Sequence, residues 1–390
     1  MADAFIYDAV RTPRGKGREG GALNDVLPVD LQKVLIEAVL RRNSFDPAAI
    51  DDLILGCVTQ VGEQGGNVAK VSALHAELPA SVPGMTVNRY CTSGLDACNF
   101  AAMKIICGQD DVVLAGGVES MSRVPMLSDK AGFYGDQSMF VPMGLAADLI
   151  ASLDGMSREE CDEYAVRSQR RASRAQDDGA FSRSLISVGD VDADECVRAS
   201  VTAKKLASFE PLFPELGGQG YEQTLKDAFP GLDEMCYVHH AGNSPAIVDG
   251  ASLVVIGSVQ AADDHGLKAR ARVLAMSNVS DHELLALTGG IKAANDVLDK
   301  AGMSSADIDL VEFNEAFASV SIKFVRQAGW NEEQVNVNGG AIALGHAMGA
   351  TGATLIGTVL DELERRELST GLVAISGAAG IGTATIIERV

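Results

Sequence analysis

The stretch at positions 85–106, MTVNRYCTSGLDACNFAAMKII, indicates the fold class, because a β-like run at 85–90 passes directly into a helical run. Cys91 stands at the turn between the two runs. A second stretch at 336–357, NVNGGAIALGHAMGATGATLIG, has the same form: a strand leads through glycines into a helix, and His346 stands at the turn. Repeated strand-to-helix turns of this kind are typical of α/β proteins.

The rest of the chain continues this alternation on both sides of a different middle segment. Strands are expected at 5–10, 52–57, 111–117, 249–258, 272–277, 308–313, 371–376 and 383–388. Helices are expected at 30–42, 157–177, 290–301 and 350–367. The alternation predicts two similar α/β halves, each with a parallel sheet and crossover helices.

The middle segment differs in composition and interrupts the first half. It carries Met- and Gly-bearing loops, a charged helix and then a stretch rich in proline, glycine and charge, which indicates an inserted lid. Strand character returns after this segment, so the first half closes after the insertion. The expected organisation is a first half at 1–119 completed by 246–270, an inserted loop domain at 120–245, and a second half at 271–390.

Composition and charge limit the classes of function. The 390 residues carry a formal net charge of −21, which repels nucleic acid and anionic membrane surfaces. No apolar run approaches the ~18–20 residues that span a bilayer, and no signal-peptide pattern is present, so we expect a cytoplasmic protein without a membrane span. The seven cysteines are odd in number and form no CxxC pair, which argues against a disulfide framework and against a metal site.

Cys91 and His346 are the residues that could carry chemistry at the two turns. Amides at a helix N-terminus bear partial positive charge, so the position of Cys91 is expected to lower its pKa. A neutral imidazole is the base that a cysteine nucleophile needs. Taken alone, a buried structural cysteine and a structural histidine are the commoner cases. The glycines around His346 let the backbone approach a ligand, and the lack of a GK[ST] motif argues against a phosphate-binding loop.

Four blocks together resemble the signature blocks of the thiolase family, in the family's order and spacing: NRYCTSG at 88–94, GGVESMSR at 116–123, NEAFA at 314–318 and GGAIALGHAMGATG at 339–352. The likeness covers essentially the whole chain and is closest to degradative 3-ketoacyl-CoA thiolases. It implies the α/β thiolase fold, with two βαβαβαββ halves in a five-layered αβαβα core and a loop domain inserted in the first half. It also implies an acetyl-CoA C-acyltransferase that uses coenzyme A as a substrate and needs no cofactor. Such an enzyme cleaves 3-ketoacyl-CoA to acetyl-CoA and a shortened acyl-CoA, or runs the reverse condensation.

The resemblance assigns catalytic roles residue by residue. Cys91 would attack the keto carbon and hold the acyl group as a thioester, and His346 would activate Cys91 and help to bind the thioester oxygen. Asn314 resembles the residue that holds a water in the same oxyanion site, although a helix-capping amide is the structural alternative. The second oxyanion site would use the backbone N–H groups of Cys91 and Ala378. Ser376 falls where the family has a second catalytic cysteine.

Other positions match substrate contacts of the family: Met143, Ala316 and Phe317 along the pantetheine tunnel, Ser244 beside the place of a pantetheine-binding serine, and Arg198 as a loosely aligned CoA-binding arginine. Lys204 and Lys205 would extend Arg198 into a basic patch for CoA phosphates, with a solvated surface cluster as an equal alternative. Glu315 is expected to orient its neighbours. The segment 116–120 is expected to pack near the nucleophile as a structural loop.

Departures from the family pattern leave a second interpretation open. Ser376 replaces a thiol that can exchange a proton near neutral pH, which a serine hydroxyl hardly can. Pro245 and Ala347 also replace the usual serine and proline. The alternative to an active thiolase is therefore a catalytically impaired, CoA-binding thiolase-like subunit. A decarboxylating ketoacyl synthase on the same fold is disfavoured by the NEAFA block. A homodimer or homotetramer is expected, and a fatty-acid β-oxidation complex is a further expected assembly.

Overall fold

Within residues 2–390, which the computed structural model describes, ten strands follow the order β4-β3-β5-β6-β1-β7-β10-β9-β8, with β2 paired to β6. The strands are β1 (Phe5–Arg11), β2 (Gly15–Lys16), β3 (Asp52–Gly56), β4 (Met85–Val87), β5 (Val112–Ser120), β6 (Val248–Gly257), β7 (Ala271–Ser280), β8 (Leu310–Phe313), β9 (Thr370–Ser376) and β10 (Ile381–Arg389). The order divides into two half-sheets, β4-β3-β5-β6-β1 and β7-β10-β9-β8. They join through two residue pairs of β1 and β7, Phe5 with Arg272 and Ile6 with Ala271.

The half-sheets are mixed, so the expectation of parallel sheets is wrong in part. β3 pairs in parallel with β4 and β5, and β8 pairs in parallel with β9. The pairs β5–β6, β1–β6, β1–β7, β7–β10 and β9–β10 are antiparallel. The connection from β9 to β10 covers only 377–380, and so short a connection allows a hairpin but no crossover helix.

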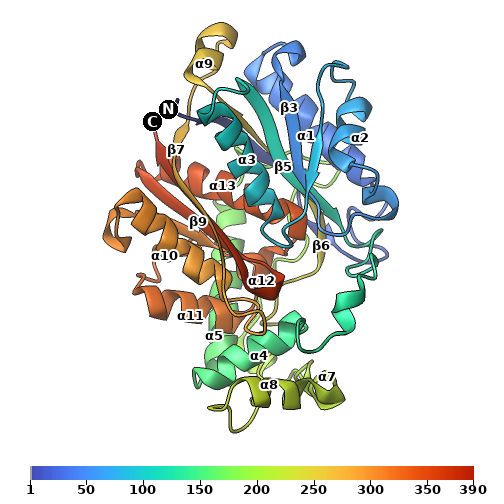
Figure 1. Ribbon diagram of the computed structural model, residues 1–390, viewed down its shortest axis with the longest axis vertical. Helices are drawn as coiled ribbons and strands as arrows, with labels where there is room; N and C mark the ends of the chain where they lie inside the picture. The colour runs from blue at the N-terminus through green and yellow to red at the C-terminus, as the bar shows by residue number, and fades with distance from the viewer. Residues whose placement is uncertain (1) are drawn as a thin grey trace.

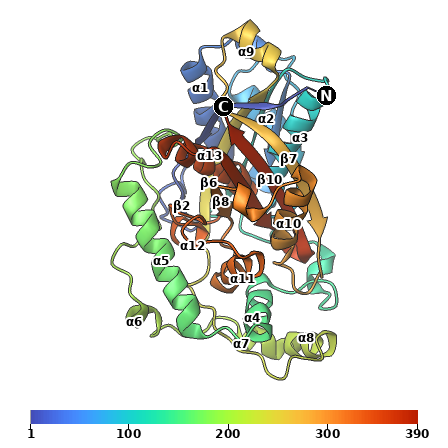
Figure 2. The same cartoon turned by 90° about the vertical axis from the view of Figure 1, so that its left-hand side faces the viewer.

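Helices form three layers around the half-sheets, which gives the five-layered αβαβα arrangement (Figures 1 and 2). α3 and α13 pack on each other between the half-sheets, α1 and α2 cover the first half-sheet, and α10 covers the second. The longer helices are α1 (Pro28–Asn43), α2 (Val68–His75), α3 (Ser93–Ile106), α4 (Met143–Leu153), α5 (Arg158–Asp177), α10 (Gly289–Ala301), α11 (Ala318–Ala328) and α13 (Met348–Arg365). The shorter ones are α6 (Ala203–Leu206), α7 (Pro214–Leu216), α8 (Glu222–Ala228), α9 (Val259–His265) and α12 (Ala341–Leu344).

The middle layer is held by apolar burial on all sides of α13. Every residue of α13 from Met348 to Leu363 is buried. Ile356 and Leu360 belong to a hydrophobic cluster that includes Leu95 of α3. Burial of one such side chain stabilises the fold by about 1.5–3 kcal/mol. Truncation of Leu360 to alanine would therefore open a cavity between the half-sheets and cost roughly 2–5 kcal/mol.

Glycines let the first turns of α3 and α13 approach more closely than side chains would permit. A Cβ atom on Gly94 would lie 2.5 Å from the carbonyl oxygen of Gly349, and one on Gly349 would lie 2.6 Å from that of Gly56. Contacts this short exclude larger residues at these places. The turns that precede the two helices, which carry Cys91 and His346, are thereby brought together.

The segment between β5 and β6 contains α4 to α8, and β6 then enters the first half-sheet between β5 and β1. α5 begins after Ser157, whose side chain accepts a hydrogen bond from the Glu160 amide at 3.2 Å and so caps the helix. Figures 1 and 2 show α4, α7 and α8 at the end of the molecule opposite to the termini. The boundaries of an inserted domain at 120–245 stay a prediction. No helix within residues 2–390 is long and apolar enough to cross a membrane.

Candidate active site

The turn before α3 holds Cys91 in a fixed and strained loop. β4 ends at Val87, and Tyr90 adopts left-handed backbone geometry with a φ of 50°, which bulky residues rarely take. The Ser93 hydroxyl donates to the Tyr90 carbonyl at 2.6 Å and accepts from the Arg89 amide at 2.8 Å. Cys91 is partly exposed and is a free thiol. The hydrogen bonds of Ser93 therefore fix the place at which the thiol is presented.

The thiol of Cys91 is not activated by its position alone. Burial, together with the nearby carboxylate of Glu119, raises the pKa of Cys91 to about 12. The expected lowering of this pKa is wrong, because burial disfavours the thiolate and Cys91 lies two residues before the start of α3 at Ser93. Glu119, at the end of β5, accepts hydrogen bonds from the amides of Val58 and Gly349, both at 3.0 Å. The thiol consequently needs a base in order to act as a nucleophile.

His346 provides a neutral imidazole at the turn before α13. Its Nδ1 lies 2.8 Å from the Thr351 hydroxyl, while its Nε2 is buried without a hydrogen-bond partner among the described residues. Burial lowers the pKa of His346 to about 4, and the Arg14 guanidinium adds to the shift. Arg14 donates to the Gly345 carbonyl at 3.3 Å and pairs with Asp194 at 3.2 Å, so its charge is held beside the turn. At neutral pH the imidazole is therefore unprotonated, but the same burial makes it a weak base, so it can take the Cys91 proton only because the resulting thiolate and imidazolium stabilise each other.

Asn314 and Ser244 add further unpaired polar atoms to those of His346. The side-chain oxygen and nitrogen of Asn314 and the hydroxyl of Ser244 are buried, and no residue from 2 to 390 forms a hydrogen bond with them. An unpaired buried polar group costs about 1–3 kcal/mol, so such groups are rare unless they serve a ligand or a reaction. Their presence in three expected site residues indicates a place that is built to meet polar groups from outside the chain.

Two backbone hydrogen bonds connect the segments that carry these residues. The amide of His346 donates to the Ala246 carbonyl at 2.9 Å. The amide of Ala318, at the end of the NEAFA block, donates to the Asn243 carbonyl at 3.2 Å. Ser244 lies between the two accepting residues. The structure thus brings the NEAFA block, the segment with Ser244 and the turn with His346 into one region.

Ser376 ends β9 close to the turn before α3, but its hydroxyl is engaged with the start of α10. The hydroxyl donates to the Leu287 carbonyl at 2.6 Å and accepts from the Gly290 amide at 2.9 Å. The following residue, Gly377, approaches the turn before α3 so closely that a Cβ atom on it would lie 3.4 Å from the Cβ of Tyr90. Because the single hydrogen of the Ser376 hydroxyl already has an acceptor, the hydroxyl is poorly placed to exchange a proton.

Ala378 is buried in the single helical turn Ala378–Gly380 that links β9 to β10. The next residue, Ala379, takes left-handed backbone geometry with a φ of 56°. The turn that contains Ala378 lies next to the turn that contains Cys91, because Gly377 approaches Tyr90. The use of their backbone N–H groups as oxyanion donors stays a prediction.

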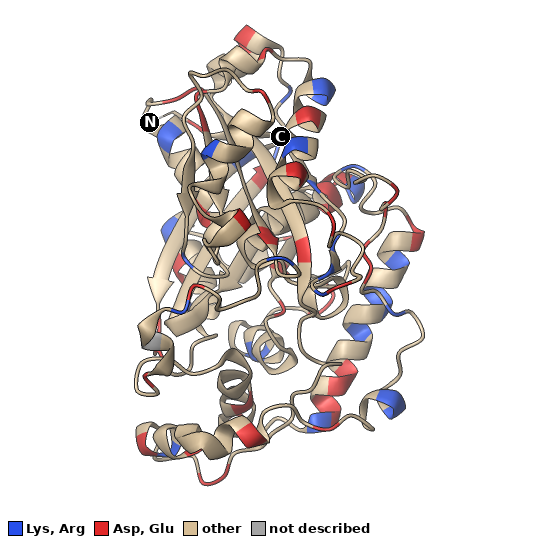
Figure 3. Cartoon of the chain, turned by 90° about the vertical axis from the view of Figure 1, so that its right-hand side faces the viewer, with Lys and Arg blue, Asp and Glu red and all other residues tan. Residues whose placement is uncertain are grey.

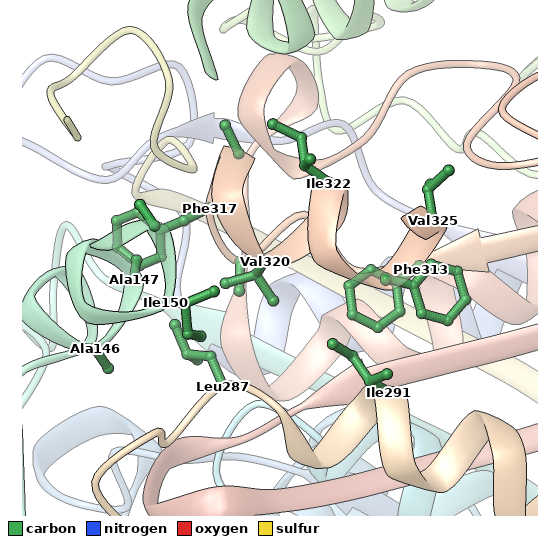
Figure 4. Close-up of a cluster of buried hydrophobic side chains, with 14 of the residues drawn as sticks. Ala146, Ala147, Ile150, Leu287, Ile291, Phe313, Phe317, Val320, Ile322 and Val325 are labelled. Atoms are coloured by element: carbon green, nitrogen blue, oxygen red, sulfur yellow. The ribbon is translucent and has the colours of Figure 1, made fainter. Parts of the chain in front are cut away.

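Met143, Ala316 and Phe317 lie between α4 and α11. Met143 is the first residue of α4 and Phe317 is the N-cap residue of α11. All three belong to one hydrophobic cluster or pack against it. The ring of Phe317 meets that of Phe213 edge-on at a centroid distance of 6.2 Å, and Figure 4 shows Phe317 beside Ala147 of α4. The structure therefore groups the three residues that are expected to line the pantetheine tunnel.

Arg198 lies beside α5 rather than on α4 or α11, and its amide donates to the Gln169 side chain at 2.7 Å. A groove of about 600 Å³ opens next to α5 and α6, lined by Glu163, Val166, Arg167, Arg170, Arg171, Arg174 and Ala203. Lys204 and Lys205 follow directly on the exposed α6. Figure 3 shows the basic residues along α5, the long helix on the right of that view. Arg167 and Arg171 pair with Glu332 and Glu333, and Glu163 lines the same groove, so the basic character of the groove rests on Arg170 and Arg174.

Sequence reasoning did not single out Thr351 and Arg14, which contact the imidazole and its turn. Thr351 follows His346 by five residues within the glycine-rich block, but His346 precedes α13 and this spacing is not that of neighbours on a helix, so periodicity did not indicate the contact. Arg14 is far away in the sequence and could not be found in this way. Glu119 packs near the nucleophile as expected, but the expectation of a loop at 116–120 is wrong, because these residues form the end of β5 and pair with β6. Glu315 accepts hydrogen bonds from α5 and α12, as expected for a residue that orients its neighbours.

Two family models match most of the chain, and known proteins match its whole length. Residues 4–219 match the family described as thiolase, N-terminal domain, and residues 267–389 match thiolase, C-terminal domain. A 3-ketoacyl-CoA thiolase of Klebsiella pneumoniae is 40% identical, with 100% of both chains covered. A steroid 3-ketoacyl-CoA thiolase of Mycobacterium tuberculosis is also 40% identical, with 100% of this chain and 95% of that one covered.

Solved structures have the same fold. The crystal structure of human mitochondrial 3-ketoacyl-CoA thiolase is similar with a TM-score of 0.89 at 30% identity, and the match covers 100% of this chain and 99% of that one. The acetyl-CoA acetyltransferase of Bacillus anthracis gives a TM-score of 0.87 at 31% identity with the same coverage. The two turns, the five-layered core and these full-length matches agree, and the chain belongs to the thiolase family.

Proposed function

We propose that this protein is a 3-ketoacyl-CoA thiolase, an acetyl-CoA C-acyltransferase that cleaves a 3-ketoacyl-CoA with coenzyme A or runs the reverse condensation. The observation that carries the proposal is the group of buried, unpaired polar atoms in His346, Asn314 and Ser244, together with the contact of Gly94 and Gly349 that brings the turn of Cys91 to the turn of His346. Relatives that are 40% identical over the whole of this chain bear the name 3-ketoacyl-CoA thiolase, which supports the same reaction here.

The roles of the residues follow from their chemistry. Nε2 of His346 takes the proton of the Cys91 thiol, so that an S–H bond breaks and an N–H bond forms. The thiolate then attacks the keto carbon, the carbon–carbon bond breaks, and its electron pair leaves with acetyl-CoA as an enolate that must gain a proton. The acyl group stays on Cys91 as a thioester until the thiol of a second coenzyme A attacks it. The S–C bond to Cys91 then breaks, the Cys91 sulfur regains the proton held by His346, and over the whole cycle the proton lost by this coenzyme A balances the proton gained by the enolate.

Charge develops on two oxygen atoms during these steps. Asn314 and the protonated imidazole of His346 would stabilise the enolate oxygen of the acetyl-CoA thioester. The backbone amides of Cys91 and Ala378 would stabilise the oxygen of the group that is attached to Cys91. Preorganised donors of this kind contribute about 3–4 kcal/mol each to the transition state. The alternative, a CoA-binding subunit without turnover, draws support from Ser376 alone, because the other expected catalytic positions are present.

The basic groove beside α5 supports a site for the phosphate groups of coenzyme A within the same proposal. Arg170 and Arg174 are exposed in it, and Arg198, Lys204 and Lys205 lie nearby. Guanidinium groups bind phosphate through paired hydrogen bonds. The double substitution Arg170→Gln and Arg174→Gln should therefore raise KM for coenzyme A while kcat changes little. The exposed arginine of α1, changed as Arg41→Gln, is the matched control.

The function is tested by supplying coenzyme A and a series of 3-ketoacyl-CoA substrates, from short to long and ring-bearing chains. Chromatography should show acetyl-CoA and an acyl-CoA shortened by two carbons, and initial rates should follow a ping-pong pattern. The proposal fails if no member of the series is cleaved, or if the Cys91→Ala variant forms acetyl-CoA at the rate of the parent.

The proposal includes assembly as a homodimer or homotetramer in the cytoplasm, with a β-oxidation complex as a further partner. Met126, Leu127 and Met139 lie between β5 and α4 with exposed fractions of 46%, 46% and 50%. Apolar side chains exposed together favour an interface. The seven free cysteines suit a reducing compartment. Native mass measurement tests the assembly, and a monomer at micromolar concentration would contradict it.

A further inference from the structure

The two ring nitrogens of His346 have different surroundings. Nδ1 lies 2.8 Å from the hydroxyl oxygen of Thr351, one turn into α13. Nε2 is buried and has no hydrogen-bond partner within residues 2–390. A neutral imidazole carries one proton, and its chemistry depends on which nitrogen holds that proton. Only the tautomer with the proton on Nδ1 leaves a lone pair on Nε2 for the thiol of Cys91.

The second partner of Thr351 decides the direction of its hydrogen bond to the ring. The Thr351 hydroxyl also lies 3.0 Å from the carbonyl oxygen of Ala347, four residues earlier in the chain. A carbonyl oxygen can only accept, so this 3.0 Å contact assigns the single hydroxyl hydrogen to Ala347, although that carbonyl also accepts from the amides of Ala350 and Thr351. The hydroxyl oxygen then meets Nδ1 with a lone pair, and Nδ1 is the donor. This arrangement favours the proton on Nδ1 over the alternative in which the hydroxyl donates to Nδ1.

We propose that Thr351 is a positioning residue that fixes His346 in the tautomer with a protonated Nδ1 and an unprotonated Nε2 directed to the reaction. The inference rests on the proposed function for its kinetic consequence. The same hydrogen bond persists when Nε2 takes the proton of Cys91, because Nδ1 remains a donor in the imidazolium. Thr351 thus holds the ring in one orientation before and after proton transfer.

Two other threonines of α13 allow the positioning role of Thr351 to be distinguished from a purely structural role. The hydroxyls of Thr354 and Thr358 bond to the carbonyls of Ala350 and Thr354 at 3.2 and 3.0 Å, in the same pattern as Thr351. All three threonines are buried, with exposed fractions of 4%, 7% and 7%. Thr351 differs because its hydroxyl has a second partner, the imidazole. Thr354 is therefore a matched control for the loss of a buried hydroxyl from this helix.

The kinetic test compares Thr351→Val, Thr351→Ser and Thr354→Val in the thiolysis assay. Thr351→Val should lower kcat roughly 10–100-fold with KM within a few-fold of the parent, as is typical when a partner that orients a catalytic imidazole is removed. Thr351→Ser keeps the hydroxyl and should stay within a few-fold of the parent, and so should Thr354→Val. Equal kcat values for Thr351→Val and Thr354→Val would overturn the proposal.

A spectroscopic test does not depend on turnover. In protein labelled with ¹⁵N-histidine, long-range ¹H–¹⁵N correlations show which ring nitrogen bears the proton, and His346→Asn identifies the signals by their loss. The parent and Thr351→Ser should show a protonated Nδ1, and Thr351→Val should show a shift of population toward a protonated Nε2. A protonated Nε2 in the parent overturns the proposal even if Thr351→Val fails to fold. If the tautomer is as expected and no substrate is cleaved, the proposed function fails while the role of Thr351 stands.

Discussion

The turn before α3 and the turn after β9 have similar backbone geometry. The side chains at these two places, Cys91 and Ser376, differ in the hydrogen bonds that they form. Each turn contains a non-glycine residue in left-handed geometry, Tyr90 with a φ of 50° and Ala379 with a φ of 56°. Cys91 in the first turn forms no disulfide and its sulfur interacts with its own backbone amide, whereas the hydroxyl of Ser376, at the end of β9, donates a hydrogen bond to Leu287 and accepts one from Gly290. Backbone strain alone therefore does not identify a catalytic group. The availability of its polar atoms is the better guide.

The sharpest test of this difference removes each side chain in turn. Cys91→Ala should lower kcat on the order of 10⁴-fold or more, since the acyl group loses its attachment point. Ser376→Ala should change kcat less than about tenfold and instead lower the free energy of unfolding by about 1–3 kcal/mol, because the Gly290 amide and the Leu287 carbonyl lose their partner. Steady-state thiolysis and urea unfolding measure the two effects. Cys107→Ala, at the other end of α3, is the control for loss of a thiol, and equal kcat losses at positions 91 and 376 would break the comparison.

The pH dependence of alkylation tests whether burial governs the thiol of Cys91. A thiol with a pKa near ~8.5 is about half ionised at pH 8.5, whereas one whose pKa is raised to about 12 has a thiolate fraction roughly 10³-fold smaller at that pH. Alkylation of Cys91 by iodoacetamide should therefore keep rising about tenfold per pH unit between pH 7 and 10. Peptide mapping of the alkylated protein gives the rate for each cysteine. A plateau below pH 9 at Cys91 would show that the helix end, not burial, sets its pKa.

The substitution Ser376→Cys should make the second turn resemble the first in chemistry. A thiol at this place can give a proton to the departing enolate and take one from coenzyme A, so kcat should rise by about 10²-fold or more. Thiolysis rates and single-turnover acylation of Cys91, measured side by side in parent and variant, separate the two steps. Robust turnover in the parent without any gain from cysteine would mean that Ser376 is not a proton-transfer position.

The smallest effect concerns the backbone strain that the two turns share. Ala379→Gly should raise the free energy of unfolding by up to about 1 kcal/mol, since glycine takes left-handed geometry without a steric cost and this gain exceeds its entropy loss. Ala378→Gly, at the adjacent position where φ is not in that region, should give no gain. Urea midpoints of the two variants decide the matter. A loss of stability at both positions would show that the strain at Ala379 is negligible.

The elements of the fold were predictable because they depend on local patterns. The charged helix expected at 157–177 is α5, and the helix expected at 290–301 agrees with α10 to one residue. The direction of the strands was not predictable in the same way. β6 and β10 lie antiparallel to their neighbours, since the long insertion and the short β9–β10 connection replace crossover helices.

The site residues were predictable where the same short segment carries both the functional residue and the turn that presents it. Cys91 and His346 could be found from their turns, but the pKa of Cys91 depends on burial and on Glu119, which sequence spacing does not show. The partners of Ser376 lie 86 and 89 residues away along the chain, so only the folded structure shows that its hydroxyl is occupied. The contact of Arg14 with the turn of His346 is likewise visible only in the folded structure, because the two segments lie far apart in the sequence.

The glycine contact between the first turns of α3 and α13 also has a consequence for the newly made chain. Cys91 leaves the ribosome long before the segment of His346 is synthesised, because the two turns belong to different halves of the sequence. Until Gly94 meets Gly349, the thiol has no imidazole to take its proton. The nascent protein therefore lacks the pair of thiol and imidazole, and catalytic turnover begins only when both halves have folded and docked.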